Sequence, residues 1–572
     1  MGGAASKKGS ASGDAPDGGN QKGSGGGGAS GGSKKAAGAS SPGGTVEAVV
    51  CKVEDMKDGE MKEVEIGKGK ALLVKEFGEF SAIGHKCTHY GAPLVKGVLC
   101  NGRVRCPWHG ACFNTKTGDI EDFPGLDSSP AFEVKVDGDN VIVKANSKDL
   151  ESHKRIKTMA CHSPEEEKTI LIVGGGAAAA LCAETLRQEG FKGCVILATK
   201  EVNLPYDRTK LSKALESTGE SLALRKPDFY SVYDIDVRTE MEAKSVDTGM
   251  HTVTFTNEQS INYDQLLVAT GGTPRKLDIP GSDLKNICLL RTPEDGKTMA
   301  EVGKGKDVVI IGSSFIGMEV ATYFQGKATS VSIVGRGSVP YGASLGEEVG
   351  KALQKLMEGK GIKFYMNANT AEFKGEDGQV TSVVLQDGQS LPAGLCVLGI
   401  GVVPATGFLE DSGLVLNNKK AVTVDKFMRT NKPNVFAAGD IADFPLCCIG
   451  EERVNIGHWQ MASQHGRIAA LNMLGLEVEV ESVPYFWTSL FGKSVRYAGY
   501  CAGFEEVVIK GNLDELKFVA YYIKDGKVTA VASMSSDPIV SQFAELLASG
   551  KDLAKSEIES DEPDWPKQLS EK

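Results

Sequence analysis

The chain has 572 residues, 41% of them hydrophobic, and a formal net charge of −11. This length accommodates about four domains, and an acidic chain without a long basic segment argues against nucleic acid as a partner. Thirteen cysteines without regular spacing fit a reducing compartment better than a disulfide scaffold. No apolar segment reaches the length of a transmembrane helix.

Residues 1–44 are dominated by Gly, Ser, Ala and Lys, so we expect a disordered tail. The tail opens with M-G-G-A-A-S, the pattern for N-myristoylation of Gly2, and Lys7 and Lys8 follow. One acyl chain with a few lysines gives reversible attachment to a membrane surface. We therefore expect a cytoplasmic protein associated with a membrane in this way; the alternative is a glycine-rich tail that matches by chance.

Residues 45–147 predict a small all-β domain that contains two hooks, each with one cysteine and one histidine. Cys87 and His89 form the first hook, and Cys106 and His109 the second. Such a set can hold zinc, or a [2Fe–2S] cluster with both cysteines on one iron and both histidines on the other. The mixed hooks favour the cluster, and the stretch C-T-H-Y-G-A-P-L … C-P-W-H-G-A-C-F resembles a Rieske centre. Structural zinc is the alternative.

A polar linker over residues 148–166 precedes the first dinucleotide fingerprint. An apolar strand at 169–173 runs into G-x-G-x-x-A, starting at Gly174, and a helix is predicted over 180–189. Gly174 makes the turn, and Gly176 lets the backbone approach a pyrophosphate at the helix N-terminus. Glu201, after the next strand, is the acid available for a ribose hydroxyl.

A second fingerprint follows the strand at 308–311, from Gly312 to Gly317, with Ser314 in place of its middle glycine. Its next strand is predicted over 331–334 and is followed by Gly335 and Arg336, with no acid at that place. A missing acid with a nearby arginine is the pattern for a 2′-phosphate, which predicts that NADPH is tolerated or preferred. Two fingerprints imply two dinucleotides, one bound flavin and one diffusible nicotinamide. A late strand ending in Gly-Asp, at Asp440, puts a carboxylate within reach of the flavin.

These motifs predict the remaining domain boundaries: a first dinucleotide-binding domain over 167–297 and 428–480, a second over 298–427, and a C-terminal domain over 481–572. The resemblance described below assigns the first of them to FAD and the second to NAD(P). The C-terminal domain has its own strands and a final amphipathic helix with apolar side chains at Ile539, Val540, Phe543, Leu546 and Leu547. The predicted fold is multidomain: a small all-β Rieske domain, then an α/β flavin reductase with two dinucleotide-binding domains, then an α+β domain.

With these motifs placed, residues 45–550 resemble the apoptosis-inducing factor group of FAD-dependent pyridine nucleotide reductases. The resemblance rests on the two hooks and on L-P-Y-D-R-x-K-L-S-K, A-T-G-G-T-P-R, R-T-P-E-D and V-P-A-T-G-F. It implies FAD in the first fingerprint and NADH or NADPH in the second. It also implies that Lys213 lies near the reactive edge of the flavin and pairs with Glu319, in a buried pair that we assign as catalytic.

The FAD site assigned in this way contains Gly174, Gly176, Ala177, Ala178, Glu201, Arg208, Lys213, Ala243, Asp440, His458, Trp459 and Trp487. The resemblance implies that the turn at His458 and Trp459, together with Trp487, lines the isoalloxazine. The NAD(P) site contains Gly312, Ser314, Phe315, Ile316, Gly317, Arg336 and Gly401.

Two functional hypotheses follow. In the first, NAD(P)H reduces FAD, and electrons pass singly to the chain's own cluster and on to an unknown acceptor, with the 148–166 linker setting the effective concentration of the two modules. In the second, the protein is a redox-sensing signalling protein with little turnover; the family's link to cell death supports this alternative and raises the mitochondrion as another location. A weaker third reading is a plain flavin reductase with structural zinc.

Overall fold

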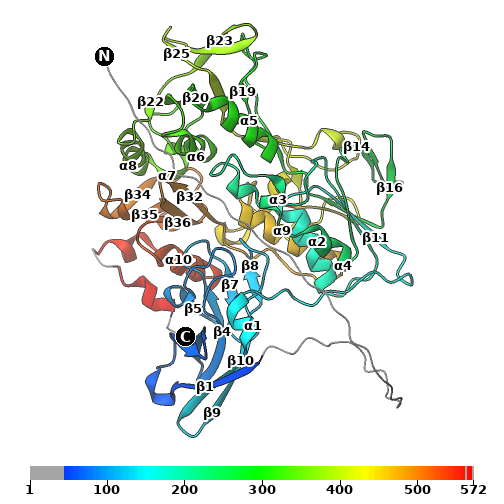
Figure 1. Cartoon of the computed structure of the whole chain (residues 1–572), viewed down its shortest axis with the longest axis vertical. Helices are drawn as coiled ribbons and strands as arrows, with labels where there is room; N and C mark the ends of the chain where they lie inside the picture. Colours follow the sequence, from blue (N-terminus) through cyan, green and yellow to red (C-terminus); the bar gives the residue numbers. More distant parts are fainter. Residues whose placement is uncertain (1–43, 561–562, 570–572) are drawn as a thin grey trace, which may run out of the picture. The chain divides into compact units, whose positions relative to one another are not determined.

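The computed structural model describes residues 44–560 and 563–569, and residues 44–572 form one compact unit (Figure 1). The predicted tail and its myristoylation pattern lie outside the described residues. No helix in the described part of the chain is both long and apolar enough to cross a membrane.

The first domain is all-β, as predicted, and its sheets are antiparallel throughout. The six-stranded sheet, in the order β1-β10-β9-β4-β3-β2, contains β1 (Thr45–Lys52), β2 (Glu60–Ile66), β3 (Gly69–Glu76), β4 (Glu79–Gly84), β9 (Ala131–Asp137) and β10 (Asn140–Asn146). A four-stranded sheet contains β5 (Val98–Cys100), β6 (Arg103–Arg105), β7 (Cys112–Asn114) and β8 (Ile120–Asp122). The first hook follows β4 and the second joins β6 to β7, so both hooks are held at their ends by strands.

The predicted linker is not a free tether. Helix α1 (Ser147–Ser152) crosses its first boundary, and the Arg155 N–H donates to the Ser128 carbonyl of the first domain at 2.8 Å. Further on, the Ala160 N–H donates to the Arg187 carbonyl of the next domain, also at 2.8 Å. Because the segment is bonded to both domains, an effective concentration computed for a flexible chain does not describe it.

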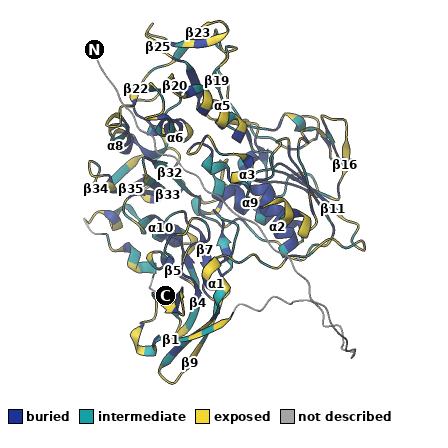
Figure 2. Ribbon diagram, in the orientation of Figure 1, coloured by how far each residue is buried: buried dark blue, intermediate teal, exposed yellow. Residues whose placement is uncertain are grey.

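The FAD-type domain has a parallel five-stranded sheet in the order β13-β12-β11-β17-β29. Its strands are β11 (Thr169–Val173), β12 (Cys194–Ala198), β13 (Ile235–Arg238), β17 (Gln265–Val268) and β29 (Val435–Ala437). Helices α2 (Ala177–Gln188) and α9 (Trp459–Met473) pack side by side and are mostly buried (Figure 2). Smaller elements complete it: α3 (Gly219–Leu222), α4 (Pro227–Val232), β14 (Ala243–Asp247), β15 (Thr252–Phe255), β16 (Ser260–Asn262), β28 (Val422–Thr423), β30 (Ala442–Leu446) and β31 (Glu452–Val454).

The second dinucleotide domain repeats this plan, with a parallel sheet in the order β19-β26-β20-β21-β22. It contains β19 (Ile287–Cys288), α5 (Pro293–Gly303), β20 (Asp307–Ile311), α6 (Phe315–Phe324), β21 (Ser330–Val334), α7 (Gly342–Leu345), α8 (Glu347–Glu358), β22 (Lys363–Tyr365), β23 (Thr370–Glu376), β24 (Gln379–Leu385), β25 (Ser390–Pro392) and β26 (Leu395–Leu398). The short pair of β18 (Gly272–Pro274) and β27 (Val402–Pro404) marks the crossing between the two dinucleotide domains.

The C-terminal domain is α+β, as predicted. Its antiparallel sheet, in the order β32-β33-β36-β35-β34, contains β32 (Tyr485–Leu490), β33 (Lys493–Gly499), β34 (Glu506–Asn512), β35 (Lys517–Lys524) and β36 (Lys527–Met534). The predicted amphipathic helix is α10 (Ile539–Ala548), which packs on β33 and β36 and also contacts β5 of the first domain. The last domain of the chain therefore touches the first.

Candidate functional site

Both predicted fingerprints form strand, turn and helix. Gly174 has a φ of +139°, and a Cβ there would lie 2.2 Å from the Ala269 carbonyl oxygen, so only glycine fits. By contrast, a Cβ on Gly176 would meet no protein atom within 4 Å. Gly176 is the N-cap of α2 and gives no side-chain cap, so the first N–H groups of the helix face open space. This arrangement fits a pyrophosphate. The helix begins at Ala177, three residues before the predicted start.

The second turn has the same build. Gly312 has a φ of +114° and lies against the Gly399 carbonyl, while a Cβ on Gly317 would lie 2.1 Å from the Gly312 carbonyl oxygen. Ser314 is exposed and is the N-cap of α6, without a side-chain cap bond, so the N–H groups there are also available to a phosphate. Phe315 and Ile316 form the first helical residues.

Two further predicted NAD(P) residues are placed but not tested. Arg336 is exposed two residues after the end of β21, and Gly401, with a φ of +92°, accepts a hydrogen bond from the Arg275 N–H at 3.0 Å. The preference for NADPH stays a prediction.

The predicted pair of Lys213 and Glu319 is present, with Nζ and carboxylate 2.8 Å apart. Glu319 is buried and also accepts hydrogen bonds from the hydroxyls of Ser212 and, at 2.7 Å, Thr488. The prediction that both members are buried is wrong for Lys213, whose side chain is 30% exposed. Glu319 comes from α6 and Thr488 from β32, so three domains meet at this carboxylate.

A second cluster of polar side chains contains the residues predicted to bind the ribityl and ribose parts of FAD. Arg208 forms an ion pair with Glu201 at 2.8 Å, and the Tyr206 hydroxyl donates to the same carboxylate at 2.7 Å. Burial raises the pKa of Asp440, against the opposing charges of Arg291 and Arg208. Glu201 is therefore engaged by Arg208 in this structure, and its contact with a ribose stays a prediction. The sequence reasoning missed Arg291, although the motif R-T-P-E-D contains it.

Ala177 and Ala178 are buried in the first turn of α2, as an FAD-binding fingerprint requires. Ala243 begins β14 and packs against the core of the same domain. Their contacts with FAD are not tested by the structure.

The two residues of the turn predicted to line the flavin, His458 and Trp459, have different surroundings. The His458 Nδ1 atom is buried without a hydrogen-bond partner, and burial lowers the pKa of this histidine to about 4. An unsatisfied buried nitrogen at this place fits a cofactor contact. The Trp459 indole instead donates to the Pro124 carbonyl of the first domain at 3.0 Å. Its side chain therefore braces the domain junction, and any contact with the isoalloxazine would come from its other atoms.

The four predicted cluster ligands converge. Cys106, Cys87 and His109 are buried, at 0%, 3% and 9% exposure, and the Cys87 thiol lies within hydrogen-bond reach of Cys106. The rings of His89 and His109 have centroids 5.0 Å apart, and the buried Nδ1 atom of His89 has no partner. Burial lowers the pKa of His89 to about 4 and of His109 to about 2, which keeps both imidazoles neutral and able to ligate iron.

The donors thus form a cysteine pair and a histidine pair, as a two-iron cluster requires. Within the described ranges, no group of three or more His, Cys, Asp or Glu side chains has an arrangement that could hold a metal ion. Gly91 and Gly110 have φ values of +77° and +73°. A Cβ on Gly110 would lie 2.7 Å from the ring of Tyr485, so this glycine also serves the contact with the C-terminal domain.

The hooks face the reductase. Trp487, on β32, has its ring centroid 4.2 Å from that of His109 and 5.6 Å from that of His89. The Ser541 hydroxyl donates to the Cys106 carbonyl at 2.9 Å, and Arg496 donates to the Trp108 carbonyl at 3.0 Å.

Beside the hooks lies a buried ion cluster, which we call the junction lock, formed by Arg105, Asp122 and Glu545. Arg105 is 1% exposed and contacts Glu545 at 2.5 Å and Asp122 at 2.7 Å. It also donates to the Gly110 carbonyl at 3.0 Å. Glu545 lies 440 residues further along the chain, so no sequence motif announces this contact.

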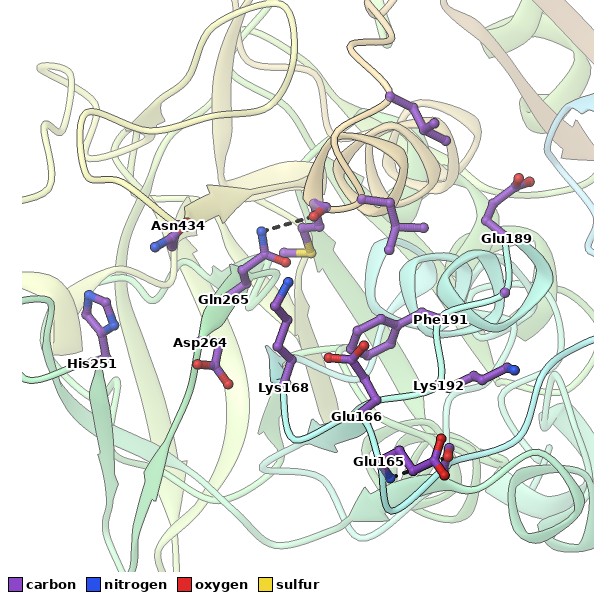
Figure 3. Close-up of a pocket in the computed structure, with 15 residues that line it drawn as sticks. Glu165, Glu166, Lys168, Glu189, Phe191, Lys192, His251, Asp264, Gln265 and Asn434 are labelled. Carbon is purple, nitrogen blue, oxygen red and sulfur yellow. Dashed lines mark hydrogen bonds between the residues drawn. The ribbon is translucent and has the colours of Figure 1, made fainter.

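A cavity elsewhere in the FAD-type domain contains none of the predicted site residues. It has a volume of about 910 Å³ and opens near Lys168 and Asp264, which directly precede strands β11 and β17 of the FAD-type sheet (Figure 3). Glu165, Glu166 and Lys192 also line it. The first fingerprint glycine, Gly174, follows the opposite, carboxyl end of β11.

Comparison with known proteins agrees with this division of the chain. The pyridine nucleotide-disulphide oxidoreductase model matches residues 168–466, the Rieske [2Fe-2S] domain model residues 46–136, and the reductase C-terminal model residues 485–565.

Three relatives illustrate the similarity. The chain is 51% identical to human apoptosis-inducing factor 3 over 524 residues, which are 91% of this chain and 87% of that protein. It is 30% identical to the benzene 1,2-dioxygenase system ferredoxin–NAD(+) reductase subunit of Pseudomonas putida, over 62% of this chain and 86% of that one. A solved ferredoxin reductase from Rhodopseudomonas palustris superposes with a TM-score of 0.66 at 29% identity, covering 71% of this chain and 99% of that one.

Fold and site together define an FAD-dependent oxidoreductase of nicotinamide nucleotides that carries its own [2Fe–2S] domain. The two hooks supply the residues for the [2Fe–2S] cluster, and the two fingerprints supply those for FAD and the nicotinamide nucleotide. The chain belongs to the pyridine nucleotide-disulphide oxidoreductase family, in the same Rieske-bearing group as apoptosis-inducing factor 3.

Proposed function

We propose that the protein passes electrons from NADH or NADPH through FAD to its own [2Fe–2S] cluster, and from there to an acceptor. The observation that carries this proposal is the position of Trp487 on β32. Its ring contacts both histidine ligands, while the next residue, Thr488, bonds Glu319 beside Lys213. One short strand thus joins the predicted reactive edge of the flavin to the cluster, and intramolecular transfer needs no docking step.

In this proposal the chain's residues bind and orient the cofactors, which supply the redox chemistry. The uncapped first turns of α2 and α6 hold the two pyrophosphates. Lys213 places a positive charge at the edge of the flavin, and buried Glu319 fixes its position through the 2.8 Å ion pair. The isoalloxazine would be lined by Trp487 and by the unsatisfied nitrogen of His458.

Electron paramagnetic resonance of the anaerobic protein tests this function. Addition of NADH or NADPH is expected to produce the rhombic signal of a reduced Rieske cluster. In Cys106→Ser the signal should be absent, while nucleotide still bleaches the flavin absorbance. A signal with dithionite but not with nucleotide would refute the relay, and so would equal reduction of the natural acceptor by the cluster-free variant.

The same experiment separates the signalling alternative. A redox-sensing protein with little turnover would accumulate a long-lived complex of reduced flavin and nucleotide and reduce one-electron acceptors slowly. The direct contact of Trp487 with His109 favours turnover.

We also propose that Gly2 is myristoylated and holds the protein at a cytoplasmic membrane surface; a mitochondrial location is the alternative. The M-G-x-x-x-S pattern with Lys7 and Lys8 supports this proposal. Fractionation of cells that express the wild-type chain or Gly2→Ala tests it: loss of membrane association only in the variant is the expected result.

A further inference from the structure

Tyr341 combines an unusual backbone conformation with a buried hydroxyl. Its φ is +58°, in the left-handed region that residues other than glycine seldom adopt, and the residue is 3% exposed. It is the N-cap of α7, and its carbonyl accepts hydrogen bonds from the N–H groups of Ser344 and Leu345 at 2.9 and 2.8 Å. Such a conformation persists only where the surrounding structure holds it, and residues of this kind cluster at functional sites.

The backbone of Tyr341 holds the turn of the second fingerprint. Its N–H donates to the Ser313 carbonyl at 2.9 Å. That carbonyl belongs to the same planar peptide unit as the Ser314 N–H, which is among the groups available to a nucleotide phosphate. Because the unit is rigid, fixing its carbonyl also orients its N–H. The Tyr341 ring packs against Phe315, the first residue of α6, with the ring centroids 5.1 Å apart.

The hydroxyl of Tyr341 faces the carboxylate beside Lys213. Burial raises the pKa of Tyr341, Glu319 raises it further, and Thr488 lowers it, so both side chains lie near the hydroxyl. Thr488 donates to one oxygen of Glu319 at 2.7 Å, and Lys213 donates to the other at 2.8 Å. Glu319 and Thr488 are carried by α6 and β32, which pack against each other (Figure 1).

Packing alone does not account for this hydroxyl. Among the described residues it has no hydrogen-bond partner of normal geometry. A phenylalanine would fill the same space against Phe315 without burying a polar group, and a buried hydroxyl without a partner is unfavourable. The nearby Thr488 hydroxyl is a partner that a small displacement of Tyr341 would supply.

We propose that Tyr341 is a positioning residue that couples occupation of the nucleotide-phosphate turn to the Lys213–Glu319 pair. A phosphate bound at the Ser314 N–H polarises the peptide unit and strengthens the bond from Tyr341 to its carbonyl. The Tyr341 hydroxyl then donates to Thr488, which completes a chain of hydrogen bonds through Glu319 to Lys213.

This coupling acts on the reduction of FAD by the nucleotide. It rests on the proposed position of Lys213 at the edge of the flavin, and it does not depend on whether electrons continue to the cluster. Because burial and Glu319 both raise the pKa of Tyr341, the phenol keeps its proton. Its role is therefore that of a hydrogen-bond donor, and the hydride passes between the two cofactors without a proton from this residue.

Anaerobic stopped-flow reduction of the FAD-loaded protein by NADH or NADPH tests the proposal. Flavin absorbance gives a limiting rate of reduction and an apparent Kd for the nucleotide. Tyr341→Phe removes the hydroxyl and keeps the ring against Phe315. The matched control is Tyr230→Phe, because the Tyr230 hydroxyl is also buried without a partner and its pKa is also raised by burial and by a carboxylate, that of Glu184.

In Tyr341→Phe we expect the limiting rate to fall about tenfold, the effect of roughly one lost hydrogen bond in a network that ends at a charged group. The apparent Kd and the denaturation midpoint should stay close to those of the wild-type protein, since the backbone bond to Ser313 remains. Tyr230→Phe should change none of the three quantities. An unchanged limiting rate in Tyr341→Phe would overturn the proposal, and so would a change in the apparent Kd alone.

A double-variant cycle separates coupling from a merely structural effect. Thr488→Val removes the hydroxyl that connects Tyr341 with Glu319. If the coupling passes through Thr488, adding Tyr341→Phe to Thr488→Val lowers the limiting rate no further, whereas two independent effects multiply and would contradict the proposal. Reduction of the cluster is followed in the same mixing experiment. Normal flavin reduction without cluster reduction contradicts the relay, so the two failures are distinguishable.

Discussion

Removal of Glu545 tests the conclusion that the cluster domain is locked to the reductase. The Glu545→Ala change deprives Arg105, which is 1% exposed, of its 2.5 Å partner. Breaking a buried ion pair by removing one member typically costs about 3–5 kcal/mol. Arg105 would keep Asp122 and the Gly110 carbonyl, so we expect the lower end, about 3 kcal/mol. That free energy corresponds to a roughly 150-fold larger equilibrium constant for opening of the junction.

Hydrogen–deuterium exchange resolved by segment measures this opening. In Glu545→Ala, residues 103–114 should exchange much faster, while the strands of the two dinucleotide domains keep their protection. The control is Asp552→Asn, which breaks an ion pair with Lys527 whose side chains are 67% and 55% exposed. Exposed pairs contribute about 0–1 kcal/mol, so exchange should barely change. Equal exchange in the two variants would refute the idea of a locked junction.

Three further changes test individual residues. Gly176→Val should leave the protein folded but without FAD, measured by flavin absorbance after purification, because the added side chain enters open space beside α2; a normal flavin content would show that the pyrophosphate lies elsewhere. Gly110→Ala should cost about 1–3 kcal/mol, seen as a lower denaturation midpoint, because its Cβ would meet the ring of Tyr485 at a φ of +73°; an unchanged midpoint contradicts this. The pKa of Asp122 is held below its ordinary value of 3.8: burial raises it, but Arg105, Arg103 and Gln464 together lower it more. A carboxylate with a depressed pKa stabilises the fold at pH values above its ordinary pKa, and this stability is lost as the pH falls through the lower pKa of the native state. We therefore expect Asp122 to cause no weakening of the junction at pH 5–7 and opening only below about pH 4. Hydrogen–deuterium exchange at different pH values measures this opening.

Local patterns predicted most of the fold. Each fingerprint is a contiguous strand, turn and helix, and the requirement for glycine at Gly174 and Gly312 is set by backbone atoms close in space. The pairing of Lys213 with Glu319 was expected only from the resemblance to a family, because 106 residues separate the two. The start of α2 was placed too late because the alanines after Gly176 carry no cap signal, although alanine favours helix strongly.

The domain junction could not be predicted from the sequence. Arg105, Asp122 and Glu545 are common surface residue types, and only the fold brings them together and buries them. The resemblance to the family assigns Trp459 to the flavin, yet its indole bonds the loop of another domain. The polar residues of 148–166 predict a flexible linker, but its backbone forms hydrogen bonds with both neighbouring domains. Each of these contacts depends on tertiary packing, which hydrophobic periodicity does not encode.

The junction lock also has a consequence for biosynthesis. Arg105 leaves the ribosome 440 residues before Glu545, and at about 5–20 residues per second this delay is on the order of 20–90 s. The Ser541 hydroxyl that holds the Cys106 carbonyl arrives equally late. During this interval the first domain can fold while both hooks remain uncovered, so iron and sulfide can be delivered to Cys87 and Cys106. The arrival of α10, the last α-helix of the described residues, then covers the hooks of the domain made first.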